Sequence, residues 1–211
     1  MNGIFVSGTD TGVGKTTVAA GLLRAASHLK PSLYWKAVQT GPDSDTAEVA
    51  RLAGVPLSSL PQPRYEFPEP LSPHLAAARA NSKISIDDLT LRAIEIAQAG
   101  FVVAEGAGGL LVPLCPGSLI IDLPLKWDLP VLLVAEDRLG AINHTLLAIE
   151  ACRSRGVRLI GVIWNRATAD FGNAESVTEV SGIQSLGRFF KSTSESAVAQ
   201  IAANTALRQL F

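Results

Sequence analysis

The stretch that decides the fold is GTDTGVGKTT, Gly8 to Thr17, which follows the apolar run Ile4 to Val6 and precedes a helical pattern from Val18 to Leu23. A glycine-rich turn between a buried strand and a helix is the usual context of a phosphate-binding loop. Small residues there let successive backbone N–H groups surround an anion at the helix N-terminus. The strict motif would have its first glycine at position 9, where this chain has Thr9. The strand and helix around the motif nevertheless favour phosphate binding over a turn that binds nothing.

Two side chains at the end of this loop predict how a nucleotide would be bound. Lys15 supplies a positive charge for the β- and γ-phosphates, and the hydroxyl of Thr16 is a candidate ligand of Mg²⁺.

Composition excludes several other function classes. Of 211 residues, 47% are hydrophobic and 18% are charged, and 18 Lys and Arg against 19 Asp and Glu give a formal net charge of -1. Near neutrality argues against nucleic-acid binding, which normally needs a basic excess, and the apolar content excludes a disordered chain. We find no basic, apolar leader and no unbroken membrane-length apolar stretch, so we expect a soluble, cytoplasmic protein without membrane partners. Its two cysteines are then ordinary thiols.

The apolar runs predict the fold class. Short runs that are apolar throughout alternate with helical stretches, which is typical of a mainly parallel sheet flanked by helices, a three-layer α/β architecture. We find no long linker or repeat and therefore expect one domain over residues 1–211. The expected strands are Ile4 to Val6, Leu33 to Val38, Phe101 to Ala104, Val131 to Ala135 and Leu159 to Trp164, and the expected helices run from Ser85 to about Gln98, from about Ile142 to Arg155, and from about Ser194 to the C-terminus.

A proline-rich segment interrupts this pattern. Six of the twelve prolines lie between Pro56 and Pro73, a density that should prevent regular structure. The segment is either a surface loop without function or, given its unusual length, a lid or substrate loop. Ser72-Pro73-His74 at its end supplies polar groups for the second interpretation.

Two acidic residues are candidate metal ligands. Glu105 ends an apolar strand and precedes the glycine-rich run Gly106 to Gly109, so it is expected where open α/β sheets bind ligands. With Thr16 it would suit Mg²⁺, although a capping or surface glutamate is the alternative. Asp45 is either a third ligand or part of a plain helix N-cap in Asp43-Ser44-Asp45, and the local sequence leaves both open.

Lys36 is the candidate for a second positive charge. It ends the apolar run Leu33-Tyr34-Trp35, so its ammonium group either reaches solvent at the sheet edge or faces the phosphates opposite Lys15. The polar turn Gln39-Thr40-Gly41 follows directly and favours the functional alternative.

Five motifs in their order and approximate spacing resemble the dethiobiotin synthetase family, the penultimate enzymes of biotin synthesis, over about residues 3 to 165. The resemblance implies a P-loop NTPase-like fold, Mg²⁺ as cofactor, ATP, 7,8-diaminopelargonic acid and CO2 as substrates, and a homodimer. The motifs are Gly8 to Thr16, Lys36 to Gly41, Ser72-Pro73-His74, Glu105 to Gly109 and Gly140 to His144.

The resemblance also implies residue roles. Lys36 is similar to the active-site lysine of the family and works with Lys15, and Thr40 and Thr11 would contact the substrate. Asn143 resembles a residue that reaches the substrate carboxylate across the dimer interface. Asn165 resembles the asparagine that reads the adenine edge, although asparagine is also common where strands end. The nucleotide and metal would be held by Gly12, Val13, Gly14, Lys15, Thr16, Thr17, Asp45, Glu105, Gly106, Ala107, Gly108 and Asn165, with Thr16, Asp45 and Glu105 as the metal ligands.

One segment departs from the family pattern. Many members carry Pro-x-Leu-Gly-x-x-Pro near the nucleotide base, whereas this chain has Gln184 and Phe190 in place of the two prolines. Because proline builds the backbone turn near the base in those members, its replacement leaves the selectivity of this site for the nucleotide base open at the level of sequence.

Three alternatives to a synthetase of this kind remain open at the level of sequence. An ATP-driven partitioning switch would carry an additional lysine five positions before Lys15, where this chain has Asp10. The other two are a related amide-forming synthetase and a nucleotide-binding module without turnover.

Overall fold

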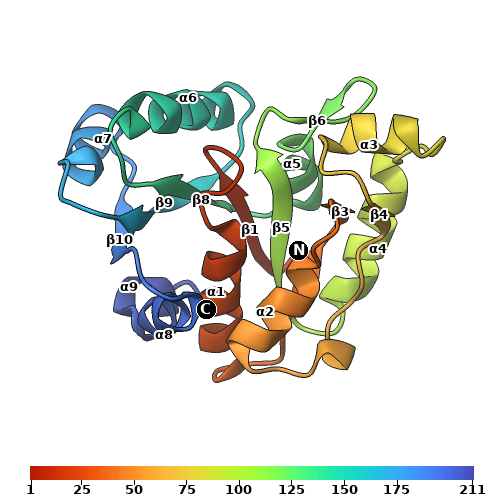
Figure 1. Ribbon diagram of the computed structural model, residues 1–211, viewed down its shortest axis with the longest axis horizontal. Coiled ribbons are helices and arrows are strands. Elements are labelled where there is room, and N and C mark those ends of the chain that lie inside the picture. The colour runs from red at the N-terminus through yellow and green to blue at the C-terminus, as the bar shows by residue number, and fades with distance from the viewer.

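A six-stranded sheet, in which all neighbouring strands run parallel, forms the centre of the molecule. Its strands are β1 (Gly3–Gly8), β2 (Ser32–Lys36), β5 (Phe101–Gly109), β8 (Val131–Glu136), β9 (Leu159–Ala167) and β10 (Ser185–Phe190). They lie in the order β10-β9-β8-β1-β5-β2, so β1, which leads into the phosphate loop, is inside the sheet. Figure 1 shows this arrangement in the computed structural model, which describes residues 1–211.

Helices cover both faces of the sheet. Successive side chains along a strand point to opposite faces, so each face of the sheet contributes to a separate apolar core. In β1, Ile4 and Val6 belong to one core and Phe5 to the other. The first core is closed by α1 (Lys15–Ser27), α2 (Asp45–Ala53), α8 (Ser194–Ala203) and α9 (Thr205–Arg208), and the second by α3 (Pro73–Arg79), α4 (Ile86–Ala97), α5 (Asp122–Trp127), α6 (Ala141–Ser154) and α7 (Asn173–Ser181). The predicted three-layer fold is confirmed. None of the helices is both long and apolar enough to cross a membrane.

The prediction of one strand from Leu33 to Val38 is wrong. β2 ends at Lys36, and the chain leaves the sheet at Ala37, whose carbonyl accepts the backbone N–H groups of Arg64 and Tyr65. The chain then forms β3 (Val38–Thr40), which pairs in parallel with β4 (Tyr65–Phe67). Lys36 is therefore the last residue of its strand in the central sheet.

The proline-rich segment has more regular structure than its composition predicts. It contains the short 3-10 helix η1 (Leu57–Ser59) and the strand β4. The three residues of β4 lie between Pro63 and Pro68 and keep their N–H groups, which allows them to pair.

The C-terminal helix is also shorter than expected. It stops at Ala203, because Asn204 is extended with φ of -67° and ψ of 121°, and the Asn204 side chain caps α9. The sequence pattern predicted neither the edge strand β10, nor the helices α3, α5 and α7, nor the hairpin of β6 (Pro113–Cys115) and β7 (Ser118–Leu119).

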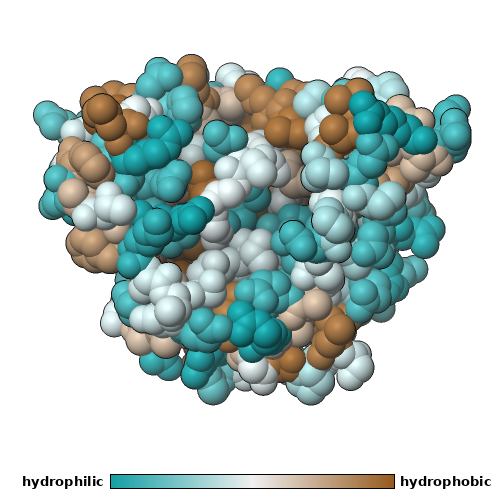
Figure 2. Space-filling view, in the orientation of Figure 1, coloured by the Kyte–Doolittle hydropathy of each residue, from teal (hydrophilic) through white to brown (hydrophobic).

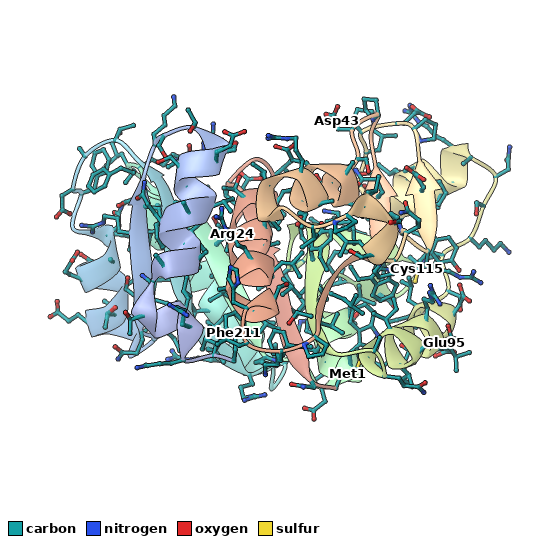
Figure 3. The ribbon with its side chains drawn as sticks, turned by 90° about the horizontal axis from the view of Figure 1, so that it is seen from below. Met1, Arg24, Asp43, Glu95, Cys115 and Phe211 are labelled. Atoms are coloured by element: carbon teal, nitrogen blue, oxygen red, sulfur yellow. The ribbon has the colours of Figure 1, made fainter.

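Parallel strands bring their carboxyl ends to one edge of the sheet, where the loops after β1, β2 and β5 meet. Figure 3 shows Asp43, in the loop after β3, at the opposite edge of the molecule from Met1, which precedes β1. In α/β sheets of this kind ligands bind at the carboxyl edge.

Candidate active site

The phosphate loop connects β1 to α1 and leaves the start of that helix open. Gly14 is the N-cap of α1, and no side chain accepts the first N–H groups of the helix. These groups and the helix dipole form a binding site for an anion. Gly14 has a left-handed φ of 93°, and a Cβ atom there would overlap the amide nitrogen of Asn165. Both the backbone and the available space therefore require glycine at this position.

Lys15 is the first residue of α1, and its side chain reaches back to the phosphate loop. Its side chain is buried, and Nζ donates a hydrogen bond to the carbonyl of Asp10 at 2.9 Å. Burial lowers the pKa of Lys15, and the negative charge of Glu105 opposes this effect.

Lys36 is the centre of a charged cluster in which Lys36 and Glu105 are buried and Asp45 is partly exposed. The register of β2 and β5 places Lys36 opposite Glu105, and Lys36 Nζ is 2.8 Å from Glu105 Oε1 and 2.7 Å from Asp45 Oδ2. It also donates to the carbonyl of Gly106 at 3.0 Å. Burial alone would lower the pKa of Lys36, but the charges of Glu105 and Asp45 outweigh it and raise that pKa above the ordinary value. Lys36 is therefore a fixed positive charge at neutral pH.

The two interpretations of Asp45 turn out to be compatible. Ser44 caps α2 by accepting a hydrogen bond from the N–H of Ala47 at 3.2 Å. Asp45, as the first residue of that helix, is free to contact Lys36 and Thr16.

The donor set of this cluster fits Mg²⁺. Thr16 Oγ1 lies 3.3 Å from Asp45 Oδ1 and 3.3 Å from Glu105 Oε1. Neighbouring ligands of an octahedral Mg²⁺ lie about 2.9 Å apart, so a small contraction brings Thr16 Oγ1 to that spacing from each of the two carboxylate oxygens. Mg²⁺ usually takes one or two carboxylates together with phosphate and water oxygens, which matches one hydroxyl and two carboxylates beside a phosphate loop.

These groups line a cavity of about 560 Å³. In Figure 2 the surface over β1, β5 and α2, in the middle of the view, is mostly hydrophilic to neutral. Val13 and Gly106 are buried outside the cavity lining. The predicted site residues that line the cavity are Thr11, Gly12, Gly14, Lys15, Thr16, Lys36, Thr40, Asp45, Glu105, Ala107 and Gly108.

The end of the proline-rich segment forms one wall of this cavity. Residues 70–73 line it, including Ser72 and Pro73 of the Ser72-Pro73-His74 motif. His74 does not line it, and its Nδ1 lies 3.1 Å from Ser72 Oγ. This position favours the interpretation as a substrate loop over that as a surface loop without function.

A second cavity, of about 280 Å³, opens beside the start of α1 and contains the two remaining nucleotide candidates, Thr17 and Asn165. Asn165 Nδ2 donates to the carbonyl of Val13 at 2.9 Å, and no protein donor reaches its Oδ1. Arg166 and the half-exposed ring of Phe190 line the same cavity.

Asn143 is not part of either cavity. It is exposed on α6 and lines a separate hollow of about 280 Å³ beside α7. Within one chain, the structure does not bring Asn143 to the phosphate loop.

Three residues near these cavities had no expected role. Tyr34, counted in the sequence as part of an apolar strand, donates its hydroxyl to Glu105 Oε2 at 2.9 Å. Burial, followed by the charge of Glu105, raises the pKa of Tyr34 well above its ordinary value. Arg166 donates to the carbonyl of Gly12 at 2.7 Å, and Phe190 lines the second cavity. Of these three residues, only Phe190 could have been found from the sequence, because it departs from the family pattern.

A phosphate loop after an inner parallel strand, with a lysine, a threonine and two carboxylates around it, defines a P-loop nucleoside-triphosphate-binding protein. Residues 2–195 match the family model described as an AAA domain. The fold is similar to that of the septum site-determining protein MinD from Pyrococcus horikoshii, with a TM-score of 0.65, 16% identity, and coverage of 100% of this chain and 94% of that one. At this identity the likeness concerns the fold alone.

The chain belongs to the family of ATP-dependent dethiobiotin synthetases. It is 46% identical to the synthetase from Rhodopseudomonas palustris strain BisB18 over 161 residues, which cover 75% of this chain and 73% of the relative. It is 40% identical to the synthetase from Sphingopyxis alaskensis over 209 residues, which cover 97% of this chain and 96% of the relative. These relatives confirm the resemblance drawn from the five motifs.

Proposed function

We propose that this protein is an ATP-dependent dethiobiotin synthetase, a cyclo-ligase formed by one domain over residues 1–211. It converts 7,8-diaminopelargonic acid, CO2 and ATP into dethiobiotin, ADP and phosphate. The observation that carries the proposal is the buried Lys36 ammonium group between Glu105 and Asp45, in one cavity with the phosphate loop. Together with the family membership, this cluster supports chemistry on anionic reactants.

The reaction forms a succession of anions in this cavity. One amine of the substrate captures CO2 to give a carbamate. A carbamate oxygen then attacks the γ-phosphate of ATP, which releases ADP and leaves a carbamic-phosphoric anhydride. The second amine then closes the ureido ring and expels phosphate. In this scheme Lys15 and the loop N–H groups bind the phosphates, and Lys36 faces the carbamate. Fixed positive charges aimed at developing negative charge, together with positioning, supply most of the catalysis.

In this proposal Mg²⁺ is held by Thr16, Asp45 and Glu105 and neutralises charge on the phosphates when it is bound. Lys36 exchanges part of its contact with the two carboxylates for contact with the substrate. Thr11 and Thr40, which line the same cavity, donate hydroxyl hydrogen bonds to the substrate.

The second cavity is proposed to hold the nucleotide base. It adjoins the phosphate loop through Gly14, which lines both cavities. Because Asn165 donates through Nδ2 to Val13, its Oδ1 is left to accept a hydrogen bond from an exocyclic amino group such as that of adenine. Phe190, which replaces a proline of the family pattern, offers an aromatic face to the base.

Replacing Phe190 by alanine is expected to weaken ATP binding roughly 10-fold, since stacking of a base on an aromatic ring contributes about 1–3 kcal/mol. Isothermal titration calorimetry with ATP measures the change. Phe171→Ala is the control, because Phe171 is similarly exposed but does not line the cavity. Wild-type affinity in Phe190→Ala would remove Phe190 from the base site.

We propose that α6 forms a dimer interface and that Asn143 reaches the substrate carboxylate in the partner's cavity. Leu139, Leu147 and Val180 are 84%, 62% and 70% exposed on α6 and its neighbours. Figure 2 shows hydrophobic side chains gathered over α6 and α7, at the upper left of the view. Exposed apolar surface of this kind is typical of protein interfaces.

Leu147→Asp is expected to convert the dimer to a monomer, because it places a charge in this apolar surface. Sedimentation velocity measures the mass. Leu91→Asp is the matched control, since Leu91 is 65% exposed on α4. A Leu147→Asp protein that sediments like the wild type would rule out this face as the interface.

Diamine-dependent phosphate release tests the synthetase function against an ATP-driven switch. A synthetase releases phosphate from Mg-ATP only when diaminopelargonic acid and bicarbonate are present. Release at the same rate without the diamine would contradict the proposal and favour the switch, although Asp10 stands where such switches carry their additional lysine.

A further inference from the structure

Tyr34 places a buried hydroxyl group directly behind the proposed metal site. Its side chain is fully buried in the apolar core that α1 and α2 close. Its hydroxyl donates to Glu105 Oε2 at 2.9 Å. A phenol hydroxyl in an otherwise apolar core needs a partner, and here that partner is one oxygen of a buried carboxylate.

The two oxygens of Glu105 have different partners. Oε2 accepts the hydrogen bond from Tyr34, whereas Oε1 contacts Lys36 Nζ at 2.8 Å and Thr16 Oγ1 at 3.3 Å. Only Oε1 therefore takes part in the cluster that faces the cavity.

The sheet explains why Tyr34 can reach this carboxylate. Tyr34 and Lys36 are two residues apart on β2 and lie on one face of the sheet, opposite Val103 and Glu105 of the neighbouring strand. Lys36 contacts Glu105 from the side of the cavity, and Tyr34 contacts it from the side of the apolar core. The carboxylate is held between a cation and a neutral donor.

We infer that Tyr34 is a positioning residue for Mg²⁺ binding: its hydroxyl fixes the rotation of the Glu105 carboxylate, so that Oε1 stays directed at Thr16 and the phosphate loop. The terminal torsion of a glutamate is broad, and without a partner on Oε2 the carboxylate is held only through the contacts of Oε1 with Lys36 and Thr16. The loss of this hydrogen bond makes the site less ordered before the metal arrives. The inference rests on the proposed nucleotide and metal roles of the cavity, not on the chemistry of the diamine.

Tyr34→Phe tests this role, because it removes one oxygen atom and keeps the ring. We expect the Mg²⁺ concentration that gives half of the full ADP affinity to rise about 10-fold, measured by calorimetry across a magnesium series, while ADP affinity in EDTA stays at the wild-type value. Tyr65→Phe is the matched control, since the Tyr65 hydroxyl also donates to a carboxylate, that of Asp88 at 2.8 Å, away from the cavity. A wild-type magnesium dependence in Tyr34→Phe would overturn the inference.

A double-mutant cycle separates positioning from a general loss of structure. If Tyr34 acts through Glu105, Tyr34→Phe no longer changes the magnesium dependence in the Glu105→Gln background. An equal effect in both backgrounds would contradict the inference.

A second measurement detects the same coupling in wild-type protein, so it does not depend on whether Tyr34→Phe folds. The chain has two tyrosines, so wild-type protein labelled with 3-fluorotyrosine gives two ¹⁹F signals, which Tyr65→Phe assigns. Addition of Mg²⁺ to the ADP complex is expected to shift the Tyr34 signal and leave that of Tyr65 in place. An unmoved Tyr34 signal would refute the coupling. Both readouts use ADP and Mg²⁺ only, so a failure of dethiobiotin synthesis would leave their outcome unchanged.

Discussion

Lys36→Ala is expected to lower synthetase turnover by roughly 10³-fold while ATP affinity changes little, since one fixed charge directed at a developing anion contributes about this much. The phosphate loop, the open start of α1 and Lys15 remain intact, and Asp45 and Glu105 are still present to hold Mg²⁺. Steady-state turnover and calorimetry with Mg-ATP measure the two quantities separately. Equal losses of turnover and affinity would place Lys36 in the nucleotide site and not at the carbamate.

Two comparisons sharpen this experiment. Lys126→Ala removes a lysine that is paired with Asp87 at the surface and should leave both quantities unchanged. Because Glu105 and Asp45 keep Lys36 charged despite its burial, its pKa lies above the ordinary value. The wild-type kcat/KM, whose pH dependence reports groups of the free enzyme, should therefore not fall from loss of this charge between pH 7 and pH 9. A decrease that follows deprotonation of Lys36 in this range would contradict its role as a fixed charge.

Gly14→Ala is expected to abolish measurable nucleotide binding. A non-glycine residue at the left-handed φ of 93° is strained by about 1–3 kcal/mol, and the new methyl group would overlap the Asn165 amide. Asn165 must then move away from Val13, or the loop must open, and both change the phosphate and base sites together. Calorimetry with ATP and thermal unfolding measure binding and stability.

Gly54→Ala is the control that separates the effect of backbone strain from the effect of the overlap with Asn165. Gly54 has a φ of 76° at the end of α2, and a Cβ atom added at that position would meet no other atom within 4 Å. Gly54→Ala should lose some stability and keep wild-type ATP affinity. ATP binding by Gly14→Ala at the wild-type level would show that the observed loop geometry is not required.

The sequence predicted those parts of the fold and site that depend on local pattern. The loop from Gly8 to Thr17 combines strand, glycine-rich turn and helix within one short segment, so its structure follows from neighbouring residues. Strands buried on both faces, such as β8, are continuous apolar runs and were found correctly. The edge strand β10 is largely half-buried or exposed and contains Gly187, and it therefore lacks such a run.

Contacts between distant segments could not be predicted in the same way. The Lys36–Glu105 ion pair joins residues 69 positions apart and depends on the register of β2 and β5. Strand β2 ends after Lys36 because the Ala37 carbonyl accepts hydrogen bonds from the N–H groups of Arg64 and Tyr65 and not from a strand of the central sheet. The resemblance to the family supplied the roles of these residues, and the structure supplied the distances between them.

The most direct test of the account is the incorporation of labelled bicarbonate into an acid-stable product by the wild-type protein. With diaminopelargonic acid and Mg-ATP we expect one fixed label for each ADP formed, because the ureido ring retains the captured carbon after acid treatment. We expect no fixed label when either the diamine or ATP is omitted. ADP formation without any acid-stable label, under conditions in which the protein binds ATP, would contradict the proposed synthetase.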